Sequence, residues 1–111
     1  MLLNDEISAD ELKTLMAAPA GGRAQLLDVR EWWERLFGAI EASAHVPLGA
    51  LERPDAGAML ARLGLQPDKR TVVYCAGGLR SLKALRVLRE RHGFTQAQSL
   101  HGGLRAWRAA A

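Results

Sequence analysis

The sequence predicts a single α/β domain, in which a small and mostly parallel sheet has helices on both faces. Its 111 residues are enough for one domain with a hydrophobic core of its own. Short apolar runs alternate with helical segments in the order α-β-α-β-α-β-α-β-α, which is typical of a parallel sheet. Because no repeat, linker or low-complexity tract interrupts this order, we expect residues 1–111 to form one domain.

The first helix is expected at residues 9–17. Ser8 and Glu11 have the spacing of a capping box, in which glutamate follows a capping serine by three residues. Apolar residues then recur at helical spacing, and Pro19 with the glycines after it marks the end. Local signals therefore define both ends of this helix.

Two strands and a short helical segment are expected next. Residues 25–29 form a short apolar run after a turn, which is typical of a buried strand. Residues 31–37 indicate one or two helical turns. Residues 44–48 indicate another short strand, in which Pro47 points to a sheet edge or to the strand end.

A helix and the strongest strand of the chain follow. Pro54 and Asp55 open the helix, and Gly64 is its expected stop. Residues 71–75 are β-branched or aromatic at most positions, which strongly favours a strand.

The longest helix is expected at residues 79–92, with Gly93 as its left-handed stop. Its expected apolar face consists of Leu82, Leu85 and Leu88, with Leu79 and Val87 beside them. Residues 98–100 then indicate a last short strand, and residues 104–110 indicate a final helix.

Charge and hydropathy exclude several kinds of partner. The net charge of +3 is small and spread along the chain, so we expect no nucleic-acid partner. No stretch of about 18 apolar residues exists, so we expect no membrane partner. The N-terminus turns acidic at Asp5, unlike a secretory signal, and we therefore expect a cytoplasmic protein.

The single cysteine, Cys75, excludes an intramolecular disulfide and a zinc site with several cysteines. In a reducing compartment it is a free thiol. His45 and His101 are too isolated in the sequence to indicate a metal site. We therefore expect neither a metal nor an organic cofactor.

The strongest functional signal is the segment at residues 75–81, CAGGLRS, which we call the thiol loop. A buried strand delivers Cys75 to its carboxyl end, where parallel sheets bind ligands. A glycine-rich turn and a helix N-terminus follow, and both present backbone N–H groups to an anion. These groups, together with the cation of Arg80, predict a thiol of lowered pKa that acts as a nucleophile. The alternative is a buried cysteine that serves only as a small hydrophobic residue.

The chain resembles the single-domain rhodanese family of sulfurtransferases. Four motifs carry the resemblance, in the right order and across residues 26–107. The matched residues are Cys75, Gly78, Arg80 and Ser81 of the thiol loop, the segments 27–31 and 45–48, and Leu100, Gly102, Gly103 and Trp107 of the C-terminal signature.

The resemblance implies a rhodanese-like fold and a sulfur transfer through a persulfide on Cys75. The donor would be a small anion such as thiosulfate, or a persulfide, and the acceptor would be a thiol or cyanide. A sulfur-relay protein is a further possible partner. The residues expected to bind substrate are Ala76, Gly77, Gly78, Leu79, Arg80 and Ser81.

The chain departs from the family pattern at three positions. The family usually has His and Gly where this chain has Ala39 and Ala42, ahead of the 45–48 motif. Larger, two-domain members often have a basic residue at the third loop position, where this chain has Gly77. The first two departures affect a loop, and the third weakens the case for thiosulfate in particular.

Three other functions are alternatives to sulfur transfer. Cysteine phosphatases have five residues between cysteine and arginine, whereas only four separate Cys75 from Arg80, which makes a smaller site. A non-enzymatic interaction module usually lacks the cysteine that this chain retains. A persulfide carrier shares the chemistry and differs only in its donor, so the sequence leaves it open.

Charged and aromatic residues after the strand at residues 25–29 are a second candidate region. Arg30 and Arg35 are possible residues of the pocket mouth, although an ion pair of Arg30 with Asp28 is the favoured reading. Trp32 and Trp33 cannot share one helix face, so at least one should be partly exposed. They form either a partner surface or a cover over the domain edge, whereas Trp107 is expected in the core.

Overall fold

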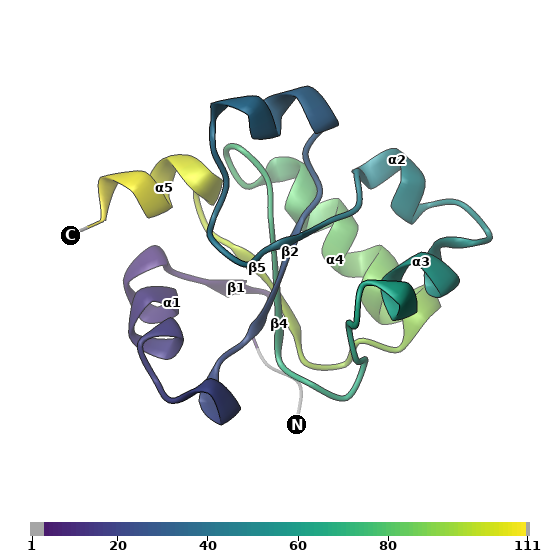
Figure 1. The fold of residues 1–111 in the computed structure, drawn as a ribbon, viewed down its shortest axis with the longest axis horizontal. Helices are drawn as coiled ribbons and strands as arrows, with labels where there is room; N and C mark the ends of the chain where they lie inside the picture. Colours follow the sequence, from purple (N-terminus) through teal and green to yellow (C-terminus); the bar gives the residue numbers. More distant parts are fainter. Residues whose placement is uncertain (1–3, 111) are drawn as a thin grey trace.

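The computed structural model describes residues 4–110, and the predicted α/β class is confirmed. The described chain contains a parallel sheet in the order β1-β5-β4-β2-β3, with helices on both faces (Figure 1). The strands are β1 (Glu6–Ile7), β2 (Gln25–Asp28), β3 (Ala44–His45), β4 (Thr71–Tyr74) and β5 (Ala97–Leu100). Residues 1–3, which belong to the N-terminal segment compared with a secretory signal, lie outside the described range. The extent of one domain over residues 1–111 stays a prediction.

The helices lie in two layers. The α-helices are α1 (Ala9–Met16), α2 (Leu48–Leu51), α3 (Ala56–Arg62), α4 (Leu79–His92) and α5 (Gly103–Ala109), and the 3₁₀-helices are η1 (Ala20–Gly22) and η2 (Trp32–Phe37). Figure 1 shows α1 and α5 on one face of the sheet and α2, α3 and α4 on the other. No helix within residues 4–110 is long and apolar enough to cross a membrane.

Side chains that alternate along the strands form the two halves of the core. On β4, Val73 packs with the α4 layer, whereas Val72 and Tyr74 pack with the layer of α1 and α5. On β2, Leu27 packs with the α4 layer and Leu26 packs with the layer of α1 and α5. Because both faces are covered, the central strand β4 is buried along its whole length, as parallel sheets require.

Several local expectations are confirmed. The capping box of Ser8 and Glu11 forms at the start of α1. Gly93 ends α4 in the left-handed conformation. Gly64, which follows α3, also has a positive φ of 82°, a conformation that suits glycine.

The strand at Glu6–Ile7 and the helix at Leu48–Leu51 are not predicted by the sequence pattern. The strand has only two residues, too few for a pattern, and its pairing with β5 defines it. The strand expected at residues 44–48 covers only Ala44–His45, because Pro47 caps the helix that begins at Leu48. The proline therefore marks the strand end, one of its two expected roles.

The apolar face of α4 differs from the prediction. Leu85 and Leu88 are buried as expected, but Leu79 is 83% exposed. The buried stripe runs through Ser81, Ala84 and the two leucines, so Leu79, two residues before Ser81, lies on the opposite side of the helix.

Candidate active site around Cys75

Cys75 follows the central strand β4, at the end of the sheet where β2 and β5 also terminate. Its side chain is buried, with only 1% of the residue exposed. The thiol loop lies beside η2 and the start of α5 at this end of the molecule (Figure 1). The topology therefore brings segments from residues 28–43, 75–81 and 100–105 to one site.

The thiol loop surrounds the sulfur with hydrogen-bonding groups. The backbone N–H of Gly78 donates to Cys75 Sγ at 3.0 Å, and the N–H of Ser81 donates at 3.4 Å. The hydroxyl of Ser81 also lies 3.4 Å from Sγ. Because Ser81 stands in the first turn of α4, the sulfur lies at the positive end of the helix dipole.

A second serine supports this arrangement from β5. The hydroxyl of Ser99 lies 2.7 Å from that of Ser81, and both residues are fully buried. Ser99 is not among the site residues predicted from the sequence. Its position inside an expected buried strand is the one sequence feature that indicates a role, because a buried hydroxyl needs a hydrogen-bond partner.

These contacts lower the pKa of Cys75. Burial alone raises it, but the hydroxyl of Ser81 and the backbone N–H groups of Ser81, Gly78 and Gly77 outweigh that effect. A thiol of lowered pKa is more strongly ionised at neutral pH and more reactive. The arrangement can therefore hold a sulfur anion, either a thiolate or a persulfide.

Glycine is required at two places where backbones approach closely. Gly78 has φ 105°, and a Cβ there would lie 3.1 Å from the backbone nitrogen of Gly102. Gly103 has φ 60°, and its Cβ would lie 2.5 Å from the carbonyl oxygen of Cys75. The backbone of the thiol loop therefore packs directly against that of the C-terminal signature. Gly77, in contrast, is exposed and has no positive φ.

The start of α5 holds the thiol loop through its backbone. The N–H of Leu104 donates to the carbonyl of Cys75 at 2.8 Å, and the N–H of Arg105 donates to that of Ala76 at 3.1 Å. These bonds satisfy loop carbonyls next to a buried thiol. They also fix the position of Arg105 beside the loop.

Arg80 does not lie free beside the sulfur. Its guanidinium forms a two-point ion pair with Glu34 of η2, at 2.6 and 2.9 Å. This pairing with Arg80 lowers the pKa of Glu34 to about 2. Glu34 is a site neighbour that the sequence did not predict, since nothing local distinguishes it from the other acidic residues of the chain.

Arg30 and Arg35, the two possible residues of the pocket mouth, both bind Asp28. Arg30 is buried and pairs with this carboxylate at 2.8 Å, as the favoured reading expected. Arg35 reaches the same carboxylate at 2.9 Å. Burial raises the pKa of Asp28, but the hydrogen bonds from Arg30 and Arg35 hold it below its ordinary value.

Large apolar side chains of η2 are exposed near the thiol loop. Trp32 is 67% exposed and Trp33 is 52% exposed, and Leu36 and Phe37 are more exposed still. Both tryptophans are therefore exposed, where at least one was expected to be. Trp107 is half-buried against the second core layer, with Lys13 over its ring.

Ala42 has an unusual backbone conformation. Its φ is 65°, a positive value that is rare for a residue with a Cβ. This is the position at which the sequence pattern departs from the expected glycine. The histidine position of that pattern, Ala39, has an ordinary φ.

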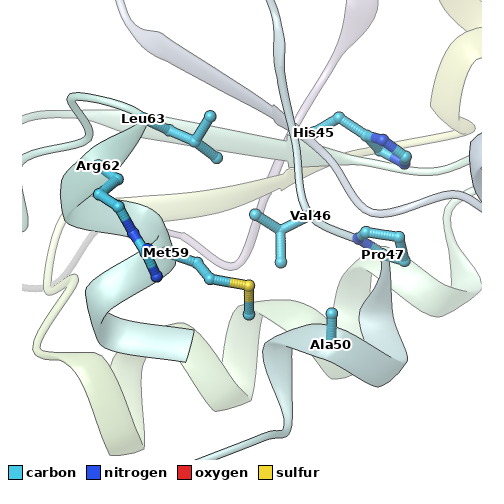
Figure 2. Close-up of a pocket in the computed structure, with 7 residues that line it drawn as sticks. All are labelled: His45, Val46, Pro47, Ala50, Met59, Arg62 and Leu63. Atoms are coloured by element: carbon cyan, nitrogen blue, oxygen red, sulfur yellow. The ribbon is translucent and has the colours of Figure 1, made fainter. Parts of the chain in front are cut away.

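His45, His101 and the cavity beside β3 do not add a reactive group to the site. His45 contacts the carbonyl of Arg30, and His101 contacts Glu6. Within residues 4–110, no cluster of three His, Cys, Asp or Glu side chains could hold a metal ion. A cavity of about 290 Å³ between β3, α2 and α3 is largely apolar, and Figure 2 shows Val46 and Met59 pointing into it. No residue of the thiol loop lines it.

Residues 8–110 match the family described as rhodanese-like domain. The chain is 32% identical over 108 residues to the human "thiosulfate:glutathione sulfurtransferase", covering 91% of this chain and 90% of that protein. It is 38% identical over 103 residues to the maize "adenylyltransferase and sulfurtransferase MOCS3-1", of which it covers only 21%.

Solved structures share the fold over nearly the whole chain. A human single-domain sulfurtransferase superposes with a TM-score of 0.79 and 28% identity, covering 98% of this chain and 99% of that one. A rhodanese-related protein of Thermoplasma volcanium superposes with a TM-score of 0.75 and 29% identity, covering 96% and 92%.

Proposed function

The chain belongs to the rhodanese-like domain family, and we propose that it is a sulfurtransferase that carries sulfane sulfur as a persulfide on Cys75. One observation carries the proposal. The sulfur of Cys75 lies at the N-terminus of α4 among N–H donors and a hydroxyl, which lower its pKa despite its burial. Such a site suits an anion that alternates between thiolate and persulfide.

In the first half-reaction, the Cys75 thiolate attacks the outer sulfur of the donor. With thiosulfate, a new S–S bond forms, the S–S bond of the donor breaks, and sulfite leaves with the bonding electron pair. The product is a persulfide anion on Cys75. The N–H groups of Gly78 and Ser81 are placed to stabilise its negative charge.

In the second half-reaction, an acceptor thiolate or cyanide attacks the outer sulfur of the persulfide. The bond between the two sulfurs of the enzyme breaks, and Cys75 leaves as a thiolate. The acceptor becomes a persulfide or thiocyanate. The first half-reaction needs no base, because the nucleophile is a Cys75 thiolate that is already ionised. We therefore assign no metal and no cofactor to the reaction.

Relatives support this class of reaction and suggest substrates. The human relative is named for thiosulfate and glutathione, which makes both of them candidate substrates here. The maize relative joins a sulfurtransferase to an adenylyltransferase, so a sulfur-relay protein is a candidate partner.

Mass spectrometry of the intact protein tests the proposal. Incubation with thiosulfate, or with a low-molecular-weight persulfide, should add the mass of one sulfur atom, and cyanide should remove it. Cys75→Ser should remain folded, gain no mass and lose turnover, because a hydroxyl is not ionised near neutral pH. Circular dichroism of the variant checks the fold.

The outcomes separate the candidate functions. Turnover with thiosulfate supports the sulfurtransferase, whereas loading only from a persulfide supports a carrier. Loading from neither donor contradicts the proposal and favours an interaction module. Turnover by a folded Cys75→Ser protein would remove the assigned role of the cysteine.

A further inference from the structure

A small basic pocket adjoins the thiol loop. It has a volume of about 220 Å³ and is lined by Arg30, Ala76, Leu104, Arg105 and Arg108. Three of the lining residues are therefore arginines, and none is acidic. A pocket of this composition next to a reactive sulfur favours an anionic group of the substrate.

Arg105 is the residue of this pocket best placed to bind a ligand. Its backbone N–H donates to the carbonyl of Ala76, which fixes its Cα beside the thiol loop. Its Nη1 lies 3.7 Å from the point where a Cβ on Gly77 would stand. The residue is exposed, and no ion pair or side-chain hydrogen bond joins it to another residue within the described chain.

The other arginines leave the region with an excess of positive charge. Arg30 and Arg35 share the single carboxylate of Asp28, so one positive charge of these two is not neutralised. Arg108 donates to the carbonyl of Phe37 at 2.6 Å, and a neutral carbonyl leaves its charge intact. An anion in the pocket therefore meets uncompensated charge.

The pocket borders the thiol loop but does not include the sulfur. Its lining contains Ala76, but neither Cys75 nor Gly78 and Ser81, which donate to the sulfur. In thiosulfate the charged oxygens are two bonds from the transferred sulfur, so they reach the groups around that sulfur, and these are not the residues of the pocket. A group bound there must belong to a larger molecule whose charge lies several bonds from its sulfur.

We propose that this pocket binds a carboxylate of the acceptor thiol, so that Arg105 selects acidic thiols over neutral ones. The inference rests on the proposed sulfurtransferase function, and it assigns a substrate class to the second half-reaction. Arg105 is in this reading a specificity residue, since it contacts the acceptor away from the reacting atoms.

The test compares two acceptors that share one skeleton. Glutathione carries two carboxylates, and its dimethyl ester carries none. With thiosulfate saturating, Arg105→Gln should raise the KM for glutathione about fivefold, the scale of one exposed ion pair. The KM for the ester and the KM for thiosulfate should stay as in the unaltered protein.

Arg86→Gln is the matched control. Arg86 is exposed on α4, is not among the residues that line the pocket, and loses the same charge. It should leave all three constants unchanged. Equal KM values for glutathione in the Arg105→Gln and unaltered proteins would overturn the inference, as would an equal change with both acceptors.

A binding measurement tests the pocket independently of turnover. S-methylglutathione keeps both carboxylates but has no free thiol. Calorimetry should show that it binds the unaltered protein about fivefold more tightly than Arg105→Gln. Turnover without this difference refutes the pocket alone, whereas binding without turnover refutes the sulfurtransferase and retains an acidic ligand for the pocket.

Discussion

At the scale of single residues, the two buried serines form a chain that ends on the sulfur. A hydroxyl has one proton, so Ser81 can donate to the thiolate only if its oxygen accepts the hydrogen bond that joins it to Ser99. Ser99 lies 2.7 Å from that oxygen and can donate to it. Ser99 therefore orients the Ser81 hydroxyl towards Cys75.

We expect Ser81→Ala and Ser99→Ala both to raise the pKa of Cys75. Loss of a hydrogen bond to a charged group costs about 1.5–3 kcal/mol, so alkylation of Ser81→Ala at neutral pH should slow about tenfold. Ser99→Ala should show a smaller loss, because it acts through Ser81. The rate of iodoacetamide alkylation against pH measures both effects.

The double variant separates positioning from general disruption. If Ser99 acts only through Ser81, its removal from a Ser81→Ala protein should leave the pKa of Cys75 where the single variant put it. Additive changes would show that Ser99 affects the sulfur by another route.

At the scale of elements, the ion pair between Glu34 and Arg80 joins η2 to the start of α4. The helix η2 has no buried residues of its own, so its apolar surface does not anchor it. The pair is two-pointed, and the Glu34 side chain is only 13% exposed. This contact therefore holds η2 beside the thiol loop.

Glu34→Gln should destabilise the protein by about 1 kcal/mol at neutral pH. The folded pKa of Glu34 is about 2, below its ordinary 4.5, so its stabilising effect is present above 4.5 and declines as pH falls towards 2. The difference between the two proteins in urea unfolding should therefore shrink over that range. A constant difference would contradict the role of the charge.

The same variant should affect the thiol in a defined direction. Arg80 keeps its charge but loses the carboxylate that neutralises it, so the pKa of Cys75 should fall further. Arg80→Ala should have the opposite effect, raising the pKa. The alkylation rate of Cys75 against pH measures its pKa in both variants. A pKa that rises in Glu34→Gln, or falls in Arg80→Ala, would contradict the expectation.

The loop before β3 carries strain at Ala42. A positive φ at a residue with a Cβ destabilises the folded protein by roughly 1–2 kcal/mol. Glycine would remove this strain, but it would also make the unfolded chain more flexible, which offsets part of the gain in stability. We expect Ala42→Gly to stabilise the protein by about 0.5–1 kcal/mol in urea unfolding. Gly49→Ala, the reverse change at an exposed site on α2 with ordinary φ, should stabilise slightly. A less stable Ala42→Gly protein would contradict the strain.

At the scale of the whole molecule, Asp28 joins three segments. It ends β2, pairs with Arg30 and Arg35, and these arginines bond the carbonyls of Gly38 and Ser43. The carboxylate is fully buried, and Arg30 is nearly so. The network therefore holds the segment from η2 to β3 against the sheet.

We expect Asp28→Asn to destabilise the protein by about 3 kcal/mol, because it leaves the buried charge of Arg30 without a counter-charge. Asp55→Asn is the matched control, since its pair with Arg53 is exposed on both sides and should contribute less than about 1 kcal/mol. Urea unfolding of both variants measures the contrast, and equal losses would show that burial does not decide the effect.

Local patterns in the sequence are enough to predict the fold class, the order of the longer elements and the thiol loop. These features depend on local patterns: β-branched residues at 71–75, the capping box at Ser8, and glycines where Gly78 and Gly93 need positive φ. The proposed nucleophile is also a local feature, because a strand, a cysteine and a helix start follow one another directly.

The residues that surround Cys75 from other segments follow from the folding of the whole chain. Ser99, Glu34 and Arg105 come from β5, η2 and α5, far from Cys75 along the chain, and no local pattern joins them to it. The short strand β1 likewise exists only through its pairing with β5. The physical reason is the same in each case: parallel strands bring distant segments to one edge of the sheet, and contacts across that edge have no period in the sequence.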